Sequence, residues 1–457
     1  MTRSDLDIAL EPTGIVGSTT TSQLGEENEE GSSERDLNTT RPAQGTTVVE
    51  ALSHYPDGGF DAWLMVACSS SLLAVAVGGI YSWGVMQDAL TGLGSTGTIA
   101  YIGSVQATFT GLLAIPCARL VASFGPRPVA LAGTVLCFLG PLTASFVTTS
   151  FVGLFILEGV VWGVGAALIF PAAATLPSSY FLKRRNLATG ITYGGGGVGG
   201  AGFSLLSSVL LNKLGIPWAL RITAFLYLAL TLPPALVLKS RFPLKPFRSG
   251  PVVEWSLFKN PTFLLLFFGA AIALFPLFVP PFFLPLFASS LGLSSLTGSL
   301  LLAGFNLASA AGRIICGLGA DRLLGSTNAQ ILCLFASAIT TFIIWPLATS
   351  LPPLAIFAVV NGFAAGGFFS LMPGVVSGLF GSSRLSSVFG AVLTSFFPGY
   401  FLGGPIAGFI LSASGGSEKG VAAFRPAIFY SGALTVVSCG LILAARITAS
   451  KELRKRI

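Results

Sequence analysis

The sequence predicts an all-helical membrane protein with twelve transmembrane helices in two related six-helix bundles. Three observations support this prediction: long apolar segments recur, charged residues are scarce, and the two halves repeat the same landmarks. Of 457 residues, 53% are hydrophobic and 9% are charged, whereas soluble proteins carry about 25% charged residues. A soluble core could not bury so much apolar surface, so we expect the excess to face lipid.

The first 56 residues differ from the rest of the chain. They are polar and poor in aromatic residues, and twelve of the eighteen carboxylates lie in residues 1–61. Such a composition predicts a disordered cytoplasmic tail. The net charge of +7 does not point to nucleic acid as a partner, because the cations stand at the ends of apolar segments instead of forming one basic face.

Apolar segments follow one another from residue 62 onward. A spanning helix needs about 20 such residues. Twelve stretches meet this requirement, over residues 62–87, 98–118, 128–149, 152–176, 186–211, 217–238, 262–288, 296–320, 328–349, 353–379, 385–412 and 425–446. Turn-forming pairs such as Gly125-Pro126 and Ile216-Pro217 separate them.

The cations predict the orientation of these segments. If the N-terminus is cytoplasmic, seventeen Lys and Arg residues fall on the cytoplasmic side and four on the opposite side. This bias predicts that both termini are cytoplasmic, by the positive-inside rule. We expect a multi-pass protein in the lipid bilayer of the plasma membrane, with the vacuolar membrane as the alternative.

A basic connector divides the segments into two sets of six. The predicted parts are the tail 1–56, an N-terminal bundle 57–238, a cytoplasmic linker 239–260, a C-terminal bundle 261–448 and a basic tail 449–457. Landmarks recur at offsets of about 200 residues, as with Pro171 and Pro373, or Gly190 and Gly390. Repeated halves with a site near the bilayer midplane are typical of secondary transporters.

The fifth segment opens with three cations and a glycine run, in YFLKRRNLATGITYGGGGVGG. Part of it satisfies G-x-G-x-x-G, but a dinucleotide loop needs a preceding strand and a following acid, and neither is expected here. Glycines spaced by three or four residues instead leave a smooth helix face that a neighbouring helix can approach closely. We expect Gly190, Gly194 and Gly197 to serve this helix packing.

Metal, cofactor and enzymatic chemistry are not indicated. The six cysteines lie in apolar stretches without a C-x-x-C pair, and the single histidine, His54, precedes the first apolar segment. Membrane enzymes need clusters of catalytic groups, whereas only one carboxylate, Glu158, lies well inside a segment. We therefore expect no metal, no cofactor and no enzymatic activity.

Arg313 is the only basic residue that falls well inside a predicted segment. Ionisable groups within a membrane are costly and are functional candidates. Guanidinium can bind a carboxylate through two parallel hydrogen bonds, and Asn306 lies two turns away on the same helical face. Two interpretations stay open: Arg313 binds an acidic substrate together with Asn306, or it bonds to backbone carbonyls and holds its helix in place.

Glu158 is the candidate for proton coupling. A carboxyl in a low-dielectric cavity can change its protonation near neutral pH. The alternative is a structural role, because Glu158 lies about 10 Å from the outer end of its helix, at 1.5 Å per residue, where water can hydrate it.

Three motifs resemble a known family. GLGADRLLG (residues 317–325) resembles the loop signature of the major facilitator superfamily, and DGGFDAW (57–63) and PSSYFLKRRNLATG (177–190) resemble the signatures of its monocarboxylate-transporter-like members, fungal ones included. The resemblance implies the major facilitator fold and transport by alternating access. Animal lactate carriers of that family place a lysine where this chain has Tyr81 and an aspartate where it has Ser309, but they share the arginine at Arg313.

The resemblance also indicates residues that face the transport pathway. In the superfamily, helices 1, 4, 7 and 10 line the cavity, which adds Tyr81, Trp162 and Asn361 to the candidate substrate-binding residues. Its two-fold pseudo-symmetry places the loop between helices 8 and 9 near the start of helix 5. We therefore expect a cytoplasmic gate between Asp321 and the pair Arg184 and Arg185.

The predicted function is secondary active transport of a small organic solute. Within that class, an organic acid or a fungal secondary metabolite is expected, including efflux from a biosynthetic cluster, and protons are the candidate coupling ion. A monocarboxylate/proton symporter for uptake and a non-transporting membrane sensor on the same fold are the alternatives. We expect a monomer.

Overall fold

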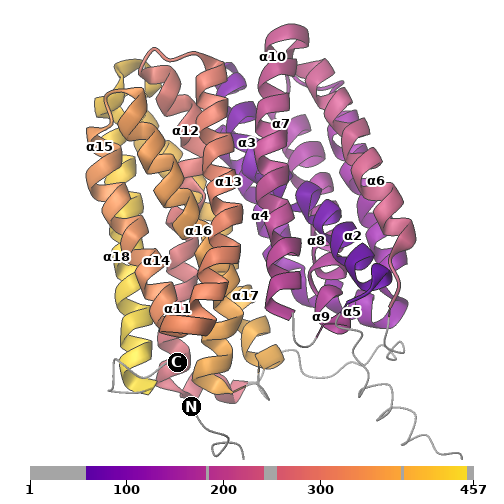
Figure 1. The fold of residues 1–457 in the computed structure, drawn as a ribbon. Coiled ribbons are helices and arrows are strands. Elements are labelled where there is room, and N and C mark those ends of the chain that lie inside the picture. The colour runs from indigo at the N-terminus through magenta and orange to yellow at the C-terminus, as the bar shows by residue number, and fades with distance from the viewer. Residues whose placement is uncertain (1–57, 182–184, 241–254, 382–384, 450–457) are drawn as a thin grey trace, which may run out of the picture. The chain divides into compact units, whose positions relative to one another are not determined.

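The computed structural model describes residues 58–181, 185–240, 255–381 and 385–449, which belong to one compact unit, Tyr55–Ile457. Within these ranges the chain is helical and contains no strand. The helices run roughly side by side in two bundles, α2 to α10 in one and α11 to α18 in the other (Figure 1). The predicted all-helical fold with two bundles is confirmed.

The first bundle contains the helices that precede residue 240. They are α2 (Phe60–Ala76), α3 (Gly78–Ala89), α4 (Thr96–Leu112), α5 (Ala114–Phe124), α6 (Pro126–Ala144), α7 (Phe151–Leu154), a π-helical turn η2 (Phe155–Val161), α8 (Trp162–Ala174), α9 (Pro177–Tyr180) and α10 (Arg185–Val237).

The second bundle contains the helices that follow residue 260. They are α11 (Pro261–Leu277), α12 (Val279–Ser290), α13 (Ser295–Gly319), the π-helical turns η4 (Ala320–Leu324) and η5 (Thr340–Ile344), α14 (Ser326–Ile339), α15 (Trp345–Leu347), α16 (Leu351–Phe380), α17 (Leu385–Ala413) and α18 (Val421–Ala449). Short 3₁₀ turns lie at Thr91–Leu93, Trp255–Lys259 and Ser417–Lys419.

The helices account for the twelve predicted segments. Among the described residues, ten helices are long and apolar enough to cross a membrane, and α4 with α5, bent by 53°, adds an eleventh span. One of the ten, Leu187–Val237, contains Gly215 with φ 75°, which interrupts the helix and divides it into the predicted fifth and sixth segments. The second segment runs to Phe124 instead of residue 118, because the chain stays helical beyond its bend.

The two bundles repeat the same helix-start chemistry. Ser95 and Ser294 each accept a hydrogen bond at 3.2 Å from the backbone N–H three residues further on, which caps the starts of α4 and α13. Gly125 and Gly325, with φ of 89° and 78°, directly precede α6 and α14. These matched positions support the internal repeat that the sequence predicts.

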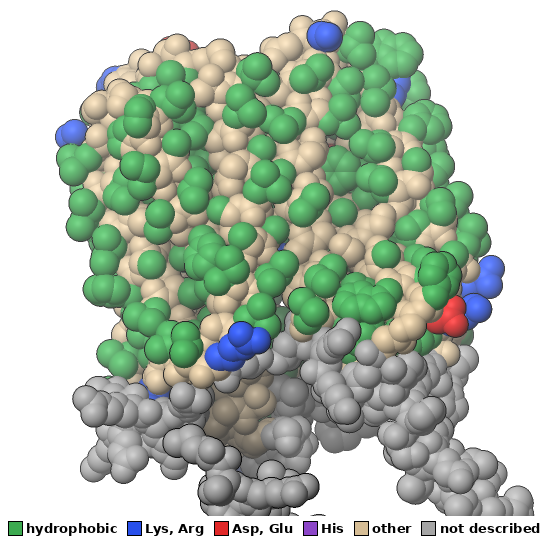
Figure 2. All heavy atoms as spheres, in the orientation of Figure 1, with side chains coloured by type: hydrophobic (Ala, Val, Ile, Leu, Met, Phe, Trp, Pro, Cys, Tyr) green, Lys and Arg blue, Asp and Glu red, His purple; other side chains and the backbone are tan. Residues whose placement is uncertain are grey.

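The outer surface suits a lipid environment. Figure 2 shows apolar side chains distributed across the visible face, with Lys and Arg side chains toward its edges. Large apolar side chains such as Val198, Leu307 and Ile356 are more than half exposed. Such a surface would be unstable in water and is stable in a bilayer. The chain is therefore an integral, multi-pass membrane protein.

One basic residue differs from its predicted place. Arg446 ends the predicted segment 425–446 and is one of the seventeen cations predicted on the cytoplasmic side, but it is fully buried within α18. Its Nε donates a hydrogen bond to Asn328 Oδ1 at 3.1 Å, at the start of α14. Arg313 is therefore not the only buried cation. The apolar pattern could not show this, because the partner that binds the charge, Asn328, lies on another helix.

Helix α13 and helix α16 make their contact through glycines. Gly362 and Gly366 of α16 lie against the backbone carbonyls of Phe305 and Ser309, and Gly312 of α13 lies against α16 in return. A side chain at any of these glycines would overlap the facing backbone. Two helices in a membrane gain packing energy from this approach, since lipid offers no hydrophobic driving force. The contact sets the position of α13, which carries Arg313.

We predict that Gly366→Leu destabilises the protein. The new side chain would have to displace the backbone at Ser309, and overpacking of this kind costs about 1–3 kcal/mol. The thermal midpoint of the purified protein in detergent measures the effect. Gly304→Leu is the matched control, because a Cβ at Gly304 would meet no atom within 4 Å. Equal midpoints for the two variants would contradict the proposed packing.

Candidate substrate-binding site

Arg313 lies at the contact between the two bundles. It is 2% exposed, and its position on α13 directs it toward α3 and α10 of the first bundle. Its Nη2 donates a hydrogen bond to Tyr81 Oη at 2.8 Å, and its Nη1 donates one to the Tyr193 carbonyl oxygen at 2.5 Å. One guanidinium therefore connects the second bundle to two helices of the first.

The partners of Arg313 are neutral. No carboxylate in the described part of the chain forms an ion pair with Arg313, and its Nε has no hydrogen-bond partner there. The rings of Tyr81 and Phe369 lie 5.4 and 5.6 Å from the guanidinium carbon, within the range of cation–π attraction. The positive charge is stabilised by dipoles and ring faces, and it can still accept an anion.

Aromatic side chains continue from this guanidinium along the contact between the bundles. The ring of Phe278 lies 5.6 Å from that of Tyr81 and 5.3 Å from that of Tyr400, and Phe396 lies 6.0 Å from Tyr400. Tyr193, Phe369 and Tyr400 keep part of their surface accessible although Arg313 is buried. The arrangement offers one fixed cation beside an apolar, aromatic wall.

Asn306 belongs to the same neighbourhood. It is fully buried, and neither its Oδ1 nor its Nδ2 has a hydrogen-bond partner among the described residues. A Cβ placed on Gly200 would lie 2.9 Å from Asn306 Nδ2 and 3.1 Å from Tyr81 Cβ. The structure thus brings Arg313, Tyr81 and Asn306 together beside the glycine face of α10.

The glycine run of α10 makes this meeting possible. Cβ atoms on Gly195 and Gly199 would overlap the backbone of α2 at Ser70 and Ala74. On another side of α10, a Cβ on Gly197 would lie 2.6 Å from the Asn306 carbonyl oxygen of α13. Gly190 and Gly194 face Ile314 of α13 more loosely, at 3.7 and 3.9 Å. Helix α10, which belongs to the first bundle, therefore packs closely on α2 of its own bundle and on α13 of the second bundle.

Two predicted ligand residues lie elsewhere. Trp162 is fully buried inside the first bundle, with its ring against Gly79 and 6.0 Å from that of Tyr227. Asn361 donates hydrogen bonds from Nδ2 to Ser337 Oγ at 3.0 Å and to Thr340 Oγ1 at 3.1 Å, inside the second bundle. The structure does not group either residue with Arg313. Only some side chains of a helix that lines the cavity point into it, and knowing which helix lines the cavity does not show which side chains these are.

Glu158 lies within the first bundle, in the π-helical turn η2. It is 7% exposed. Gln106 Nε2 of α4 donates to the Glu158 backbone oxygen at 3.0 Å and to Oε1 at 3.4 Å, while Oε2 has no partner in the described residues. π-Helical turns occur often at functional sites. Sequence reasoning missed Gln106, whose only signal was a polar side chain within an apolar segment.

The predicted cytoplasmic gate cannot be placed. Arg184 lies outside the described residues. Arg185 is described only as the first residue of α10, and Asp321 only as part of η4, without their side chains. The gate stays a prediction.

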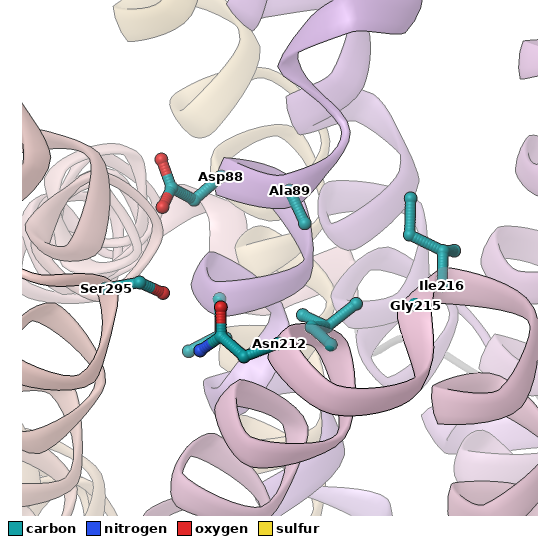
Figure 3. A pocket seen from close by; sticks show the side chains of 8 residues that line it. Asp88, Ala89, Asn212, Gly215, Ile216 and Ser295 are labelled. Atoms are coloured by element: carbon teal, nitrogen blue, oxygen red, sulfur yellow. The ribbon is translucent and has the colours of Figure 1, made fainter.

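A polar pocket of about 300 Å³ lies at the end of the bundles where α3 ends and α13 begins. Figure 3 shows Asp88, Asn212 and Ser295 around it, on α3, α10 and α13. Asp88 Oδ2 also accepts a hydrogen bond from Ser289 Oγ of α12 at 3.3 Å, which connects the two bundles. Sequence reasoning did not single out Asp88, although it is one of six carboxylates in the body of the chain.

Comparison with known proteins agrees with this architecture. A family model described as Major Facilitator Superfamily matches residues 63–345 and 266–456. The chain is 30% identical over 404 residues to "MFS-type transporter 1" of Ophiocordyceps sp. (strain BCC 1869), covering 87% of each chain. It is 32% identical over 322 residues to the "Fujikurins efflux protein" of Gibberella fujikuroi, covering 69% of each.

A solved structure shows the same fold. The crystal structure of the nucleoside transporter NupG is similar with a TM-score of 0.67 at 14% sequence identity, covering 84% of this chain and 100% of that one. At this identity the likeness concerns the fold alone. None of these matches distinguishes the monocarboxylate-transporter-like members from the rest of the superfamily.

We predict that Tyr81→Phe weakens the contact between the bundles. The change removes the hydroxyl that accepts from Arg313 Nη2, and hydrogen bonds to charged groups contribute about 1.5–3 kcal/mol. A lower thermal midpoint than that of the unmodified protein is expected. Tyr101→Phe is the control, because the ring of Tyr101 packs on Phe401 without reaching Arg313. If both variants melt together, the Tyr81 hydroxyl does not hold the bundles.

Proposed function

Because the chain belongs to the major facilitator superfamily, we propose that this secondary active transporter exports an organic acid with an apolar or aromatic body. One observation carries the proposal: Arg313 lies buried between the two bundles and has only neutral partners among the described residues. In alternating access the site must be reached from each side in turn, and the contact between the bundles is where both routes meet.

The charge of Arg313 favours an anionic substrate. A buried charge without an opposite charge is expensive, and hydroxyl and carbonyl dipoles offset that cost only in part. A carboxylate or an enolate would neutralise the positive charge of Arg313 and could accept two parallel N–H hydrogen bonds from the guanidinium. Holding Arg313 with neutral groups leaves its charge available to a substrate, which a permanent ion pair would not.

The aromatic wall favours a substrate larger than lactate. The rings of Phe278, Phe396 and Tyr400 extend beside the guanidinium, and such surfaces bind flat or apolar bodies. Lactate carriers of the superfamily resemble this chain at Arg313 but carry charges where it has Tyr81 and Ser309. Here Tyr81 supplies the hydroxyl that holds Arg313. Uptake of a small monocarboxylate is therefore the weaker alternative.

Export is favoured over import by one relative. The Fujikurins efflux protein is named for efflux of fujikurins and is 32% identical to this chain over 69% of its length. We propose a similar direction here, from the cytoplasm outward. A non-transporting sensor on the same fold is the second alternative, and measured flux would exclude it.

The remaining parts of the proposal concern placement. The cation bias supports cytoplasmic termini, and we propose residence in the plasma membrane. Bundles over 57–238 and 261–448, joined by a linker over 239–260, stay our proposed division of the chain. We also propose that the transporter works as a monomer, since both bundles of one chain supply the groups around Arg313.

Proton coupling through Glu158 is the further proposal. Its carboxyl oxygen Oε2 is buried without a partner in the described residues, while Gln106 holds Oε1. Gln106 belongs to α4, which packs against α17 of the other bundle. A change in the protonation of Glu158 could therefore reach the contact between the bundles through one side chain.

We predict that Arg313→Lys abolishes most export, since a point charge cannot reproduce the two-point fork of guanidinium. The native host with the gene deleted should retain an organic acid inside the cells, and metabolite profiles of cells and medium identify it. We expect the unmodified gene to restore release of this acid from the deletion strain, whereas the Arg313→Lys gene, expressed at the same level, should not. Arg221→Lys is the control, because Arg221 is held by Ser145 within the first bundle. Full release by Arg313→Lys and Arg313→Ala would refute the substrate role.

We predict that Glu158→Gln makes flux insensitive to pH. An amide cannot exchange the proton that the carboxyl carries, so any pH dependence that arises at Glu158 disappears. Flux of the identified acid is measured against external pH in both proteins. Glu418→Gln, an exposed carboxylate in the Ser417–Lys419 turn, is the control. A mutant profile that follows the unmodified one would remove Glu158 from the coupling.

A further inference from the structure

Two cysteines, one on α13 and one on α14, meet in the fold one helical turn beyond Arg313. All six cysteines lie in the described ranges and all are free. Cys333 Sγ donates a hydrogen bond to Cys316 Sγ at 3.7 Å. Cys316 lies three residues before the end of α13, and Cys333 lies in the middle of α14. Their spacing of 17 residues matches no disulfide or metal motif, so the sequence alone does not pair them.

We propose that Cys316 and Cys333 form a redox modification site, which a peroxide converts into a disulfide. The sulfurs must approach by roughly 1.7 Å to reach the S–S bond length of about 2.05 Å. They are already hydrogen-bonded, so each thiol has the other as its nearest reaction partner. We expect rotation of the two cysteine side chains to supply this movement.

The chemistry balances with one peroxide. Cys316 is half-buried, whereas Cys333 is 8% exposed, so we expect Cys316 to react first. It attacks the O–O bond of hydrogen peroxide, becomes a sulfenic acid and releases one water molecule. Cys333 then attacks the sulfenic sulfur, the S–O bond breaks, and a second water molecule leaves. Two thiols are oxidised by two electrons, and one peroxide is reduced to two waters.

The residues around Cys316 and Cys333 leave room for the two sulfurs to form a disulfide. The apolar side chains that cluster with the pair are mostly small, namely Ala320, Ala329, Ala336 and Ala364, together with Leu371. A Cβ on Gly367 of α16 would lie 2.6 Å from Cys333 Sγ and 2.9 Å from Cys316 Sγ. Helix α16 therefore closes one side of the pair at a residue without a side chain. The other approach runs past the end of α13, where Arg322 and Leu323 are exposed.

The depth of the pair permits attack by a small oxidant. Cys316 lies about 4.5 Å from the end of α13, at 1.5 Å per residue. Beyond that end the chain turns through η4 and enters α14. A disulfide would join the two helices of this hairpin across the turn and restrict their relative motion.

The restriction would act close to Arg313. Cys316 follows Arg313 by one helical turn on α13, the helix that packs against α10 of the other bundle. If the proposed transport function holds, oxidation should slow the exchange between inward- and outward-open states and leave the guanidinium in place. The modification itself does not depend on that function, so its chemistry can be tested separately.

The other four cysteines make poor competitors. Cys137 Sγ donates to the Trp162 carbonyl at 3.8 Å, and Cys439 Sγ donates to the Ile331 carbonyl at 3.7 Å. Neither Cys68 nor Cys117 contacts another sulfur within the described ranges. Cys439 is half-buried like Cys316 and has no thiol neighbour, so Cys439→Ser serves as the matched control.

Thiol counting on the purified full-length protein tests the proposal. The protein in detergent is exposed to hydrogen peroxide, unfolded and alkylated with a maleimide, and its mass is measured. We expect two of the six thiols to be lost, a cross-linked peptide that contains Cys316 and Cys333, and recovery of both thiols with a reductant. Cys316→Ser and Cys333→Ser should give no such peptide, and Cys439→Ser should give it as the unmodified protein does.

Three results would overturn the proposal. All six thiols could stay free under both peroxide and copper(II)–phenanthroline, the cross-link could join other cysteines, or Cys439→Ser could abolish it. Comparison of flux by oxidised and reduced protein then addresses the transport consequence. Unchanged flux in protein shown to contain the disulfide would reject the restriction while leaving the modification site in place.

Discussion

The guanidinium of Arg313 is the interaction on which the proposed site depends. It extends from α13 and reaches Tyr81 and the Tyr193 carbonyl of the other bundle. Because these partners are dipoles and not carboxylates, the bundles are held together without neutralising the charge. A link of this kind is strong enough to define a closed contact, and an arriving anion can still compete for it. Structural and substrate roles of Arg313 are therefore compatible.

Close helix packing places that guanidinium. The facing glycines of α13 and α16 fix α13 within the second bundle, and Gly197 and Gly200 let α10 come within reach of Asn306. In lipid, such contacts rest on van der Waals packing, because apolar surface gains nothing by leaving an apolar solvent. Smooth faces also permit small displacements, which alternating access requires. The glycine run thus explains how α10 comes close to the proposed site, and it is compatible with a contact that opens during transport.

Particular residues show how far prediction from the sequence reached. The twelve apolar segments, and the selection of Arg313 as a candidate, follow from the cost of exposing polar groups to lipid, which acts on each segment separately. The sequence also selected Asn306 and Tyr81, which the fold places beside one another. It selected Trp162 and Asn361 as well, although Trp162 packs inside the first bundle and Asn361 bonds to Ser337 and Thr340 in the second. Helix number alone does not determine which way a side chain points.

Composition and hydrophobic pattern alone determined that this chain crosses a membrane many times, because each span must satisfy its own backbone hydrogen bonds, and recurring landmarks such as Pro171 and Pro373 indicated two repeated halves. Only the tertiary structure decided which residues meet. The Arg313–Tyr81 bond joins positions 232 residues apart, Phe278 and Tyr400 face each other from different helices, and two cysteines without a motif come into contact. Such pairings depend on helix rotation and crossing, which are set by packing between helices and leave no periodic signal in either helix.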